Sequence, residues 1–209
     1  IWPTTEFNDR SGLATSSRKV ALQLWDGKIP TGDPVRNAKL LFGAENPPGS
    51  KYISGSQDHI GLMVPGISRI YYEGGYWPSD IKNCTDPSVC EWLSEVLYLI
   101  PLKPRPTGYD PIEEKNLEKE YVKELGDSGN KCWDSIIKKD VKGLGKAMTE
   151  SFLAWKKILP NTVPDHIMNE MTYYTSNYPG AITSGSGGGY AMVASEKNIE
   201  GSIRIKVKF

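Results

Sequence analysis

Hydrophobic positions near the start of the chain follow the spacing of helices separated by turns. Val20, Ala21, Leu24 and Trp25 recur at helical intervals and predict a helix that ends at Gly27. Asp33 and Pro34 are favoured at the cap and first position of a helix, and they predict the start of a second one. Its apolar face carries Val35, Ala38, Leu41 and Phe42, and the helix should end near Glu45 because Pro47 and Pro48 cannot continue it.

The middle of the chain changes to extended patterns. A short helical run from Gln57 is followed by a predicted strand over 67–72 and a hairpin turn over 73–76. Residues 79–90 are polar and are expected to be irregular, so we place a domain boundary there. The continuous apolar run over 96–100 is typical of a buried strand.

The second half alternates long helices with strands. Residues 114–158 predict two helices with a break near 138–141, and another helix follows Pro164. Strands are predicted near 181–182 and over 190–194 and 203–207. This order predicts an α+β fold with helices packed on an antiparallel sheet. The core candidates on the long helices are Trp133, Ile136, Ile137, Leu144, Met148, Phe152 and Trp155.

Composition narrows the class of protein. The 209 residues are 38% hydrophobic, and six Trp and eleven Tyr add enough apolar surface for a core. Lys plus Arg equals Asp plus Glu at 25 each, so net charge gives no reason to expect nucleic acid or membrane partners. No apolar run approaches ~18 residues, the length of a membrane span. Three widely spaced cysteines favour a reduced, cytoplasmic environment.

Three segments could carry chemistry, and the first is Gly12 to Ser17. Glycine allows close approach to a ligand, and hydroxyls at a helix start lie where free N–H groups favour an anion. A serine hydroxyl there can also bind Mg²⁺. The alternative is an ordinary Ser/Thr helix cap. The segment is no Walker A loop, because the chain has no Gly-Lys-Ser/Thr.

The second segment, Gly185 to Gly189, has four glycines in five residues between two predicted strands. Such a loop is costly in backbone entropy unless something lies close to the main chain. A flexible hairpin loop is the alternative. The third segment is Ser54 to His59. Here Asp58 could act as a general base while Glu45 binds a metal, or Asp58 could simply cap a turn. With two histidines in the chain, a His-rich zinc site is excluded.

Together and in this order the three segments resemble the motifs of the GHMP kinases. The run from Gly12 to Ser16 is similar to their Gly-Leu-Gly-Ser/Thr-Ser motif, and 185–190 is similar to their C-terminal glycine run. Residues 54–59 resemble the Gly-Gly-x-Gln-Asp-Gln segment of bacterial sugar kinases that act on heptose phosphate and fucose. The likeness covers nearly the whole chain.

This resemblance implies a role for each motif residue. ATP would bind at Gly12, Leu13, Ala14, Thr15, Ser16 and Ser17, and Mg²⁺ at Ser16 and Glu45. Asp58 would be the catalytic base toward the acceptor hydroxyl. The substrate-binding residues would be Gly185, Gly187, Gly188, Gly189 and Arg105, although Arg105 could also be a solvated loop residue. Three positions depart from the family pattern. Ala14 replaces a glycine, and Arg18 and Lys19 stand where small apolar residues are common, where they could add phosphate contacts or face solvent.

The resemblance also implies the architecture and partners. Residues 1–90 would form a nucleotide-binding N-terminal domain of ribosomal-protein-S5-like type that lacks its first strands, and 91–209 a ferredoxin-like C-terminal domain, in the two-layer GHMP kinase fold. The family's first motif is absent, so an N-terminal segment of the enzyme is expected to be missing. The expected partner is a sugar or sugar phosphate, with neither nucleic acid nor membrane, and a homodimer is compatible with this. The alternatives are a GHMP-type ATP-dependent decarboxylase and a non-catalytic metabolite-binding protein of the same fold.

Overall fold

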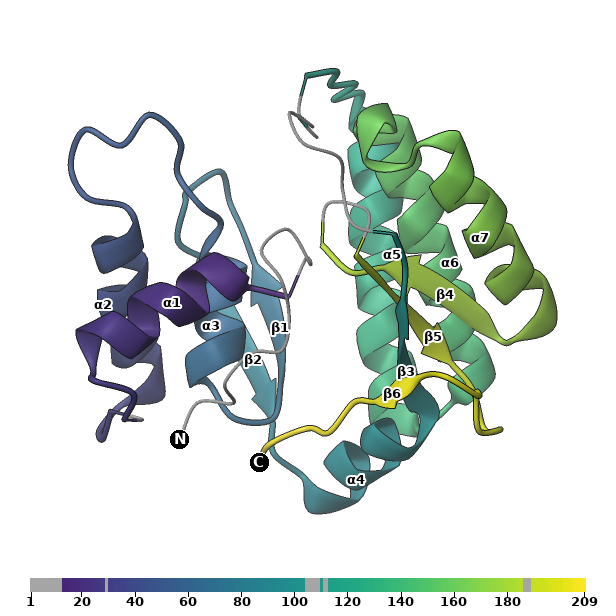
Figure 1. Cartoon of the computed structure of the whole chain (residues 1–209), viewed down its shortest axis with the longest axis horizontal. Coiled ribbons are helices and arrows are strands. Elements are labelled where there is room, and N and C mark those ends of the chain that lie inside the picture. Colours follow the sequence, from purple (N-terminus) through teal and green to yellow (C-terminus); the bar gives the residue numbers. More distant parts are fainter. Residues whose placement is uncertain (1–12, 29, 104–109, 111–112, 186–188) are drawn as a thin grey trace. The chain divides into compact units, whose positions relative to one another are not determined.

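The computed structural model divides the chain into two compact units. It describes residues 13–28, 30–103, 110, 113–185 and 189–209. Residues 14–90 and 207–209 form the first unit, and Leu13 and residues 91–206 form the second. Each unit has its own secondary structure, and Figure 1 labels the elements.

The first unit consists of three helices and a β-hairpin. The helices are α1 (Thr15–Leu24), α2 (Pro34–Glu45) and α3 (Ser56–Met63), and the hairpin pairs β1 (Ile67–Tyr71) with β2 (Asp80–Cys84). The predicted helices and the first strand are confirmed. Asp33 caps α2 as expected, because its side chain accepts a hydrogen bond of 2.9 Å from the Val35 N–H. Buried Leu41 and Ala21 pack α2 against α1, and buried Ala38 and Ile60 pack it against α3.

The expectation that residues 79–90 are irregular was wrong. They contain β2 and the start of helix α4 (Pro87–Val96). Strand β2 is mostly exposed and polar, and it is extended because every residue from Asp80 to Cys84 pairs with β1. Helix α4 has a recognisable start, because Asp86 accepts a hydrogen bond from the Ser88 N–H and Pro87 follows it directly. The same acid–proline pair marks the start of α2.

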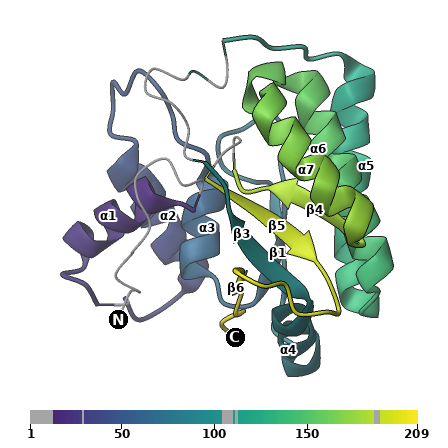
Figure 2. The same ribbon diagram turned by 45° about the vertical axis from the view of Figure 1, so that its right-hand side comes forward.

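The second unit is a four-stranded antiparallel sheet covered by helices. Its strands are β3 (Leu97–Pro101), β4 (Gly180–Thr183), β5 (Tyr190–Ala194) and β6 (Ile203–Arg204), in the order β4-β5-β3-β6. Helices α5 (Lys119–Lys138), α6 (Val141–Ile158) and α7 (Asp165–Asn177) lie together on one side of the sheet, as Figures 1 and 2 show. A 3₁₀ turn (Pro160–Thr162) joins α6 to α7.

The core of this unit lies between the sheet and helices α6 and α7. Tyr98 and Val193 from the sheet pack with Phe152 and Met171 from the helices, and all four are almost completely buried. Leu144 and Met148 are buried as predicted, but Ile137 and Trp155 are exposed. Each helix buries one stripe of residues, and in the last turn of α6 this stripe runs through Ile158.

The last predicted strand is shorter than expected. It ends at Arg204: β6 is in register with β3 at Tyr98 and Leu99, one further bond of 3.1 Å runs from the Ile205 N–H to the Leu97 carbonyl, and the side chains of β6 are exposed. Residues 207–209 belong to the first unit, where the Gly66 N–H donates a hydrogen bond of 2.5 Å to the Lys208 carbonyl. None of the three cysteines, Cys84, Cys90 and Cys132, takes part in a disulfide. Within the described part of the chain, no helix has the length and apolar character that crossing a membrane requires.

Candidate active site

Polar side chains from three helices of the first unit meet at one carboxylate, that of Glu45. Glu45 is the last residue of α2, and its side chain is 12% exposed. The Ser17 hydroxyl, in the first turn of α1, donates a hydrogen bond of 2.6 Å to Glu45 Oε2. Nε2 of His59, in α3, lies 2.6 Å from the same oxygen. The structure therefore brings together residues that are 14 and 28 positions from Glu45 in the sequence.

The start of α1 is shaped by Ala14. This residue adopts the left-handed conformation, with φ 54° and ψ 37°, and it contributes no side-chain cap. Its carbonyl accepts the first helical bond, from the Arg18 N–H at 3.0 Å. The N–H groups of the preceding turn have no partner within the helix, and the helix dipole makes this end favourable for an anion. Ser17 is fully buried beneath this turn, and Ser16 is exposed.

Hydrogen bonds from loop residues fix the ends of α2 and α3 near Glu45. The Asn46 carboxamide oxygen accepts a bond of 2.7 Å from the Ser54 N–H, which closes the loop between the two helices. Ser56, the first residue of α3, is fully buried and donates a bond of 2.7 Å to the Tyr76 carbonyl. The first turn of α3, which carries Asp58 and His59, is thereby tied to the β-hairpin.

The two acidic side chains have opposite pKa shifts. Burial alone would raise the pKa of Glu45, but hydrogen bonds from His59, Ser17 and Ser16 outweigh it and hold that pKa below its ordinary value. Burial raises the pKa of Asp58, against the attraction of His59, with a further increase from the Glu45 charge. Arg18 also opposes this rise, and its own pKa is lowered by burial. One carboxylate is thus stabilised in its charged form, and the other is made more basic.

His59 and Arg18 were not among the predicted site residues. His59 is completely buried, and its ring meets the Phe42 ring edge-on with centroids 5.3 Å apart. Its Nδ1 and the Arg18 Nε are buried atoms without a hydrogen-bond partner among the described residues. For His59, a signal was available in the sequence: it lies three residues after Ser56, so both fall on the buried face of α3.

The remaining predicted residues divide between described and undescribed parts of the chain. Gly12, Gly187, Gly188 and Arg105 lie outside the described residues, as does the side chain of Thr15, while Leu13 directly precedes Ala14. Gly185 and Gly189, in the second unit, have positive φ values of 62° and 86° and flank the turn from β4 to β5. That the glycine run shares a cleft with residues 12–17 and 58 stays a prediction.

The backbone of Gly189 is already hydrogen-bonded within the second unit. Its N–H donates to the Lys103 carbonyl at 3.0 Å, and its carbonyl accepts from the Leu102 N–H at 2.8 Å. These bonds continue the pairing of β3 with β5 beyond Pro101. The amide of Gly189 therefore holds the loop to the sheet.

The residues around Glu45 fit a magnesium site of the kind that phosphoryl transfer uses. Mg²⁺ in such sites is held by one or two carboxylates together with substrate phosphates and water, rather than by a cage of protein ligands. Glu45 supplies a charged carboxylate, and exposed Ser16 supplies a hydroxyl hydrogen-bonded to it. Among the described residues, no group of three or more His, Cys, Asp or Glu side chains is placed to hold a metal.

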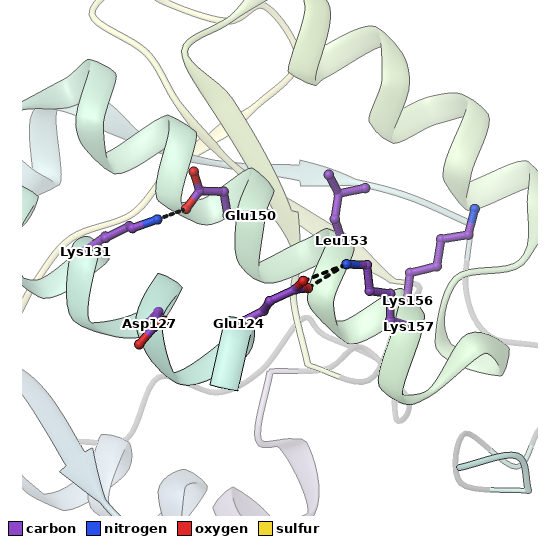
Figure 3. Close-up of a pocket in the computed structure, with 7 residues that line it drawn as sticks. All are labelled: Glu124, Asp127, Lys131, Glu150, Leu153, Lys156 and Lys157. Carbon is purple, nitrogen blue, oxygen red and sulfur yellow. Dashed lines mark hydrogen bonds and ion pairs between the residues drawn. The ribbon is translucent and has the colours of Figure 1, made fainter. Parts of the chain in front are cut away.

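A surface hollow of about 490 Å³ lies in the second unit, between α5 and α6 (Figure 3). Four of its charged side chains pair with each other: Lys131 with Glu150 at 2.7 Å, and Lys157 with Glu124 at 2.6 Å. Exposed pairs of this kind contribute little to stability, and here they neutralise the hollow. It contains none of the predicted site residues. The complete lining is Glu124, Asp127, Lys131, Glu150, Leu153, Lys156 and Lys157.

Comparison with known proteins identifies the fold. The sequence matches no family model and no curated protein. Among solved structures, the chain is similar to a mevalonate kinase (TM-score 0.56, 19% identity), over 84% of this chain and 52% of that one. It is also similar to the Methanococcus jannaschii mevalonate kinase (TM-score 0.53, 19% identity), over 84% and 52%. A candidate sugar kinase from Campylobacter jejuni has a TM-score of 0.57 at 16% identity, over 90% and 54%.

The chain spans about half the length of each of these kinases. At identities below one fifth, the likeness establishes the fold. The chain has an α+β fold, as the sequence predicted, and it shares this fold with these kinases.

Proposed function

We propose that this chain carries the catalytic residues of an ATP-dependent small-molecule kinase, which transfers the γ-phosphate of ATP to a hydroxyl of a sugar or sugar phosphate. The observation that carries this proposal is the meeting of Ser17, Glu45 and His59 beside Asp58, in a fold shared with kinases. Phosphoryl transfer needs positioning and charge stabilisation more than covalent chemistry, and these residue types supply both.

In this proposal the first turn of α1 binds the triphosphate. Backbone N–H groups at a helix start, with the positive end of its dipole, favour phosphate oxygens. Leu13 and Ala14 lead into this turn, and Ala14 leaves it without a side-chain cap that would occupy the same N–H groups. Arg18, one turn further along, adds a guanidinium whose buried Nε has no partner among the described residues.

Glu45 and Ser16 would hold Mg²⁺, which when bound neutralises charge on the phosphate oxygens. Glu45 suits this role because its hydrogen bonds keep the pKa low, so the carboxylate stays charged at neutral pH. Ser16 is an exposed residue, and its hydroxyl contributes to the lowered pKa of Glu45.

Asp58 would accept the proton of the attacking hydroxyl. Burial raises its pKa, which strengthens it as a base, while Arg18 and His59 keep the rise in check. The acceptor would be bound by Arg105 and by the glycine run at 185–189. Support for a sugar acceptor comes from the resemblance of residues 54–59 to the sugar-kinase motif and from the similar fold of the Campylobacter jejuni protein.

The proposal is tested by ATP consumption with Mg²⁺ across a panel of free sugars, sugar phosphates and mevalonate. We expect at least one sugar or sugar phosphate to stimulate ATP consumption, and Asp58→Asn to remove the stimulation. Stimulation by mevalonate alone would support the kinase activity and contradict the assignment of a sugar acceptor. ATP binding without stimulation by any acceptor would favour the non-catalytic binding protein.

A further inference from the structure

We propose that His59 is a positioning residue: its Nε2 fixes the Glu45 carboxylate in the orientation in which that carboxylate, with Ser16, takes a divalent cation. This inference rests on the proposed function, because it assigns a partner to the metal ligand named there. The role lies in the hydrogen bond to Glu45, and His59 itself contacts no reacting atom.

The geometry at Glu45 is asymmetric between its two carboxylate oxygens. Oε2 lies 2.6 Å from His59 Nε2 and receives the Ser17 hydroxyl, also at 2.6 Å. Neither of these two donors engages Oε1. Two donors from different helices on a single oxygen restrict the plane and direction of a carboxylate, and neither of them occupies Oε1, the oxygen that would bind a cation together with the Ser16 hydroxyl.

His59 is held firmly enough to define this direction. The side chain is completely buried, and its ring packs edge-on against Phe42, which in turn packs at 5.8 Å against Trp77. The helix that carries it is anchored by Ser56, whose hydroxyl bonds the Tyr76 carbonyl and the Tyr72 hydroxyl. Rotation of the imidazole would therefore break packing as well as the bond to Glu45.

The hydrogen bond also implies that Nε2 carries a proton. A charged carboxylate only accepts, so Nε2 must carry the proton that it donates to Glu45. Side chains that orient a metal ligand in this way are often worth ten- to a hundredfold in metal affinity. If the hydrogen bond between His59 and Glu45 were purely structural, its loss would lower the stability of the fold and leave metal affinity unchanged.

Two amide substitutions separate these roles. The amide nitrogen of His59→Gln stands the same number of bonds from Cα as Nε2 and can donate to Glu45. In His59→Asn the amide nitrogen stands where Nδ1 was and falls short. We would measure Mn²⁺ affinity with a saturating non-hydrolysable ATP analogue, nucleotide affinity without metal, and the melting temperature, for both variants and for the unmodified protein.

The expected result is a Mn²⁺ dissociation constant raised about tenfold or more in His59→Asn and about threefold or less in His59→Gln. Metal-free nucleotide affinity should stay within about twofold in both, because the triphosphate contacts are on α1. In a Glu45→Gln background, His59→Asn should cause no further loss of Mn²⁺ affinity.

Equal Mn²⁺ affinity in His59→Asn and the unmodified protein would overturn the inference and leave the proposed function intact. So would equal losses in His59→Gln and His59→Asn, since packing alone would then explain both. Failure of the unmodified protein to bind Mn²⁺ with nucleotide would overturn the proposed function and the inference together. Should His59→Asn not fold, a tenfold loss of Mn²⁺ affinity in a folded His59→Gln is enough to reject the inference.

Discussion

Gly180 in β4 lies so close to Gly145 in α6 that a Cβ on Gly180 would be 1.8 Å from the Gly145 carbonyl oxygen. A Cβ on Gly145 would in turn meet the Pro179 backbone at 2.3 Å. Beside this contact the Ala181 N–H donates a bond of 3.2 Å to the Thr149 hydroxyl. Helix and strand thus pack backbone to backbone, which brings α6 onto the sheet.

Gly180→Ala is therefore expected to lower the free energy of unfolding by about 1–3 kcal/mol or more, because rigid backbone must move to admit the methyl group. Gly126→Ala and Gly129→Ala in α5 are matched controls, since nothing lies within 4 Å of a Cβ at either position. Each control substitution should raise the free energy of unfolding by up to about 1 kcal/mol, because alanine has a better helix propensity than glycine. Urea unfolding measures all three, and an unchanged Gly180→Ala would contradict the close packing.

Ala14→Gly is expected to stabilise the protein. Ala14 has a φ of 54°, a region in which a Cβ costs about 1–2 kcal/mol and glycine is unstrained. Part of the gain is lost because glycine makes the unfolded chain more flexible, so we expect a net increase of about 0.5–1 kcal/mol. Thermal melting measures it. Ala44→Gly, within ordinary helix α2, should be destabilising, and an equal loss at Ala14 would contradict the strained turn.

Asp58→Asn is expected to reduce turnover by roughly 10²–10⁴-fold, the usual contribution of a general base, with ATP affinity nearly unchanged. The same change should raise the melting temperature at pH 7, because it removes a charge that burial disfavours.

The pH dependence of this gain follows from the direction of the shift. The pKa of Asp58 is raised in the folded state, so its ionisation costs stability above that pKa. The advantage of Asp58→Asn should be complete above the raised pKa and disappear as the pH falls through it toward 3.8, the value in the unfolded chain. An advantage that persists in acid would show that charge is not its cause.

Ser16→Ala is expected to raise the Mg²⁺ concentration for half-maximal ATP turnover by about tenfold or more, because a hydroxyl beside Glu45 is lost. Activity at saturating Mg²⁺ should recover in part. Ser176→Ala, an exposed serine in α7, is the control. Unaltered metal dependence in Ser16→Ala would remove Ser16 from the metal site.

Sequence patterns located most elements of this fold because their signals are local. Asp33 with Pro34, and the apolar run at 190–194, indicate where α2 and β5 lie. Strand β2 escaped prediction because polar Asp80 to Cys84 become extended through pairing with β1, which is a tertiary effect.

The candidate site was only partly predictable for the same reason. Ser16, Glu45 and Asp58 could be proposed as site residues from residue type and from their resemblance to the motifs. The convergence of Ser17 and His59 on one oxygen of Glu45 depends on how three helices pack, and no local pattern encodes it. Arg18 is a candidate because its Nε is buried, and the neighbouring residues in the sequence do not predict that burial.

The two donors on Glu45 Oε2 have a further consequence for the thermodynamics of ligand binding. A free glutamate side chain loses up to about 2 kcal/mol of rotamer freedom when it is immobilised. Here that loss occurs when the protein folds, because Ser17 and His59 already restrain the carboxylate. An incoming ligand meets a preorganised group, and little of its binding free energy is spent on ordering Glu45.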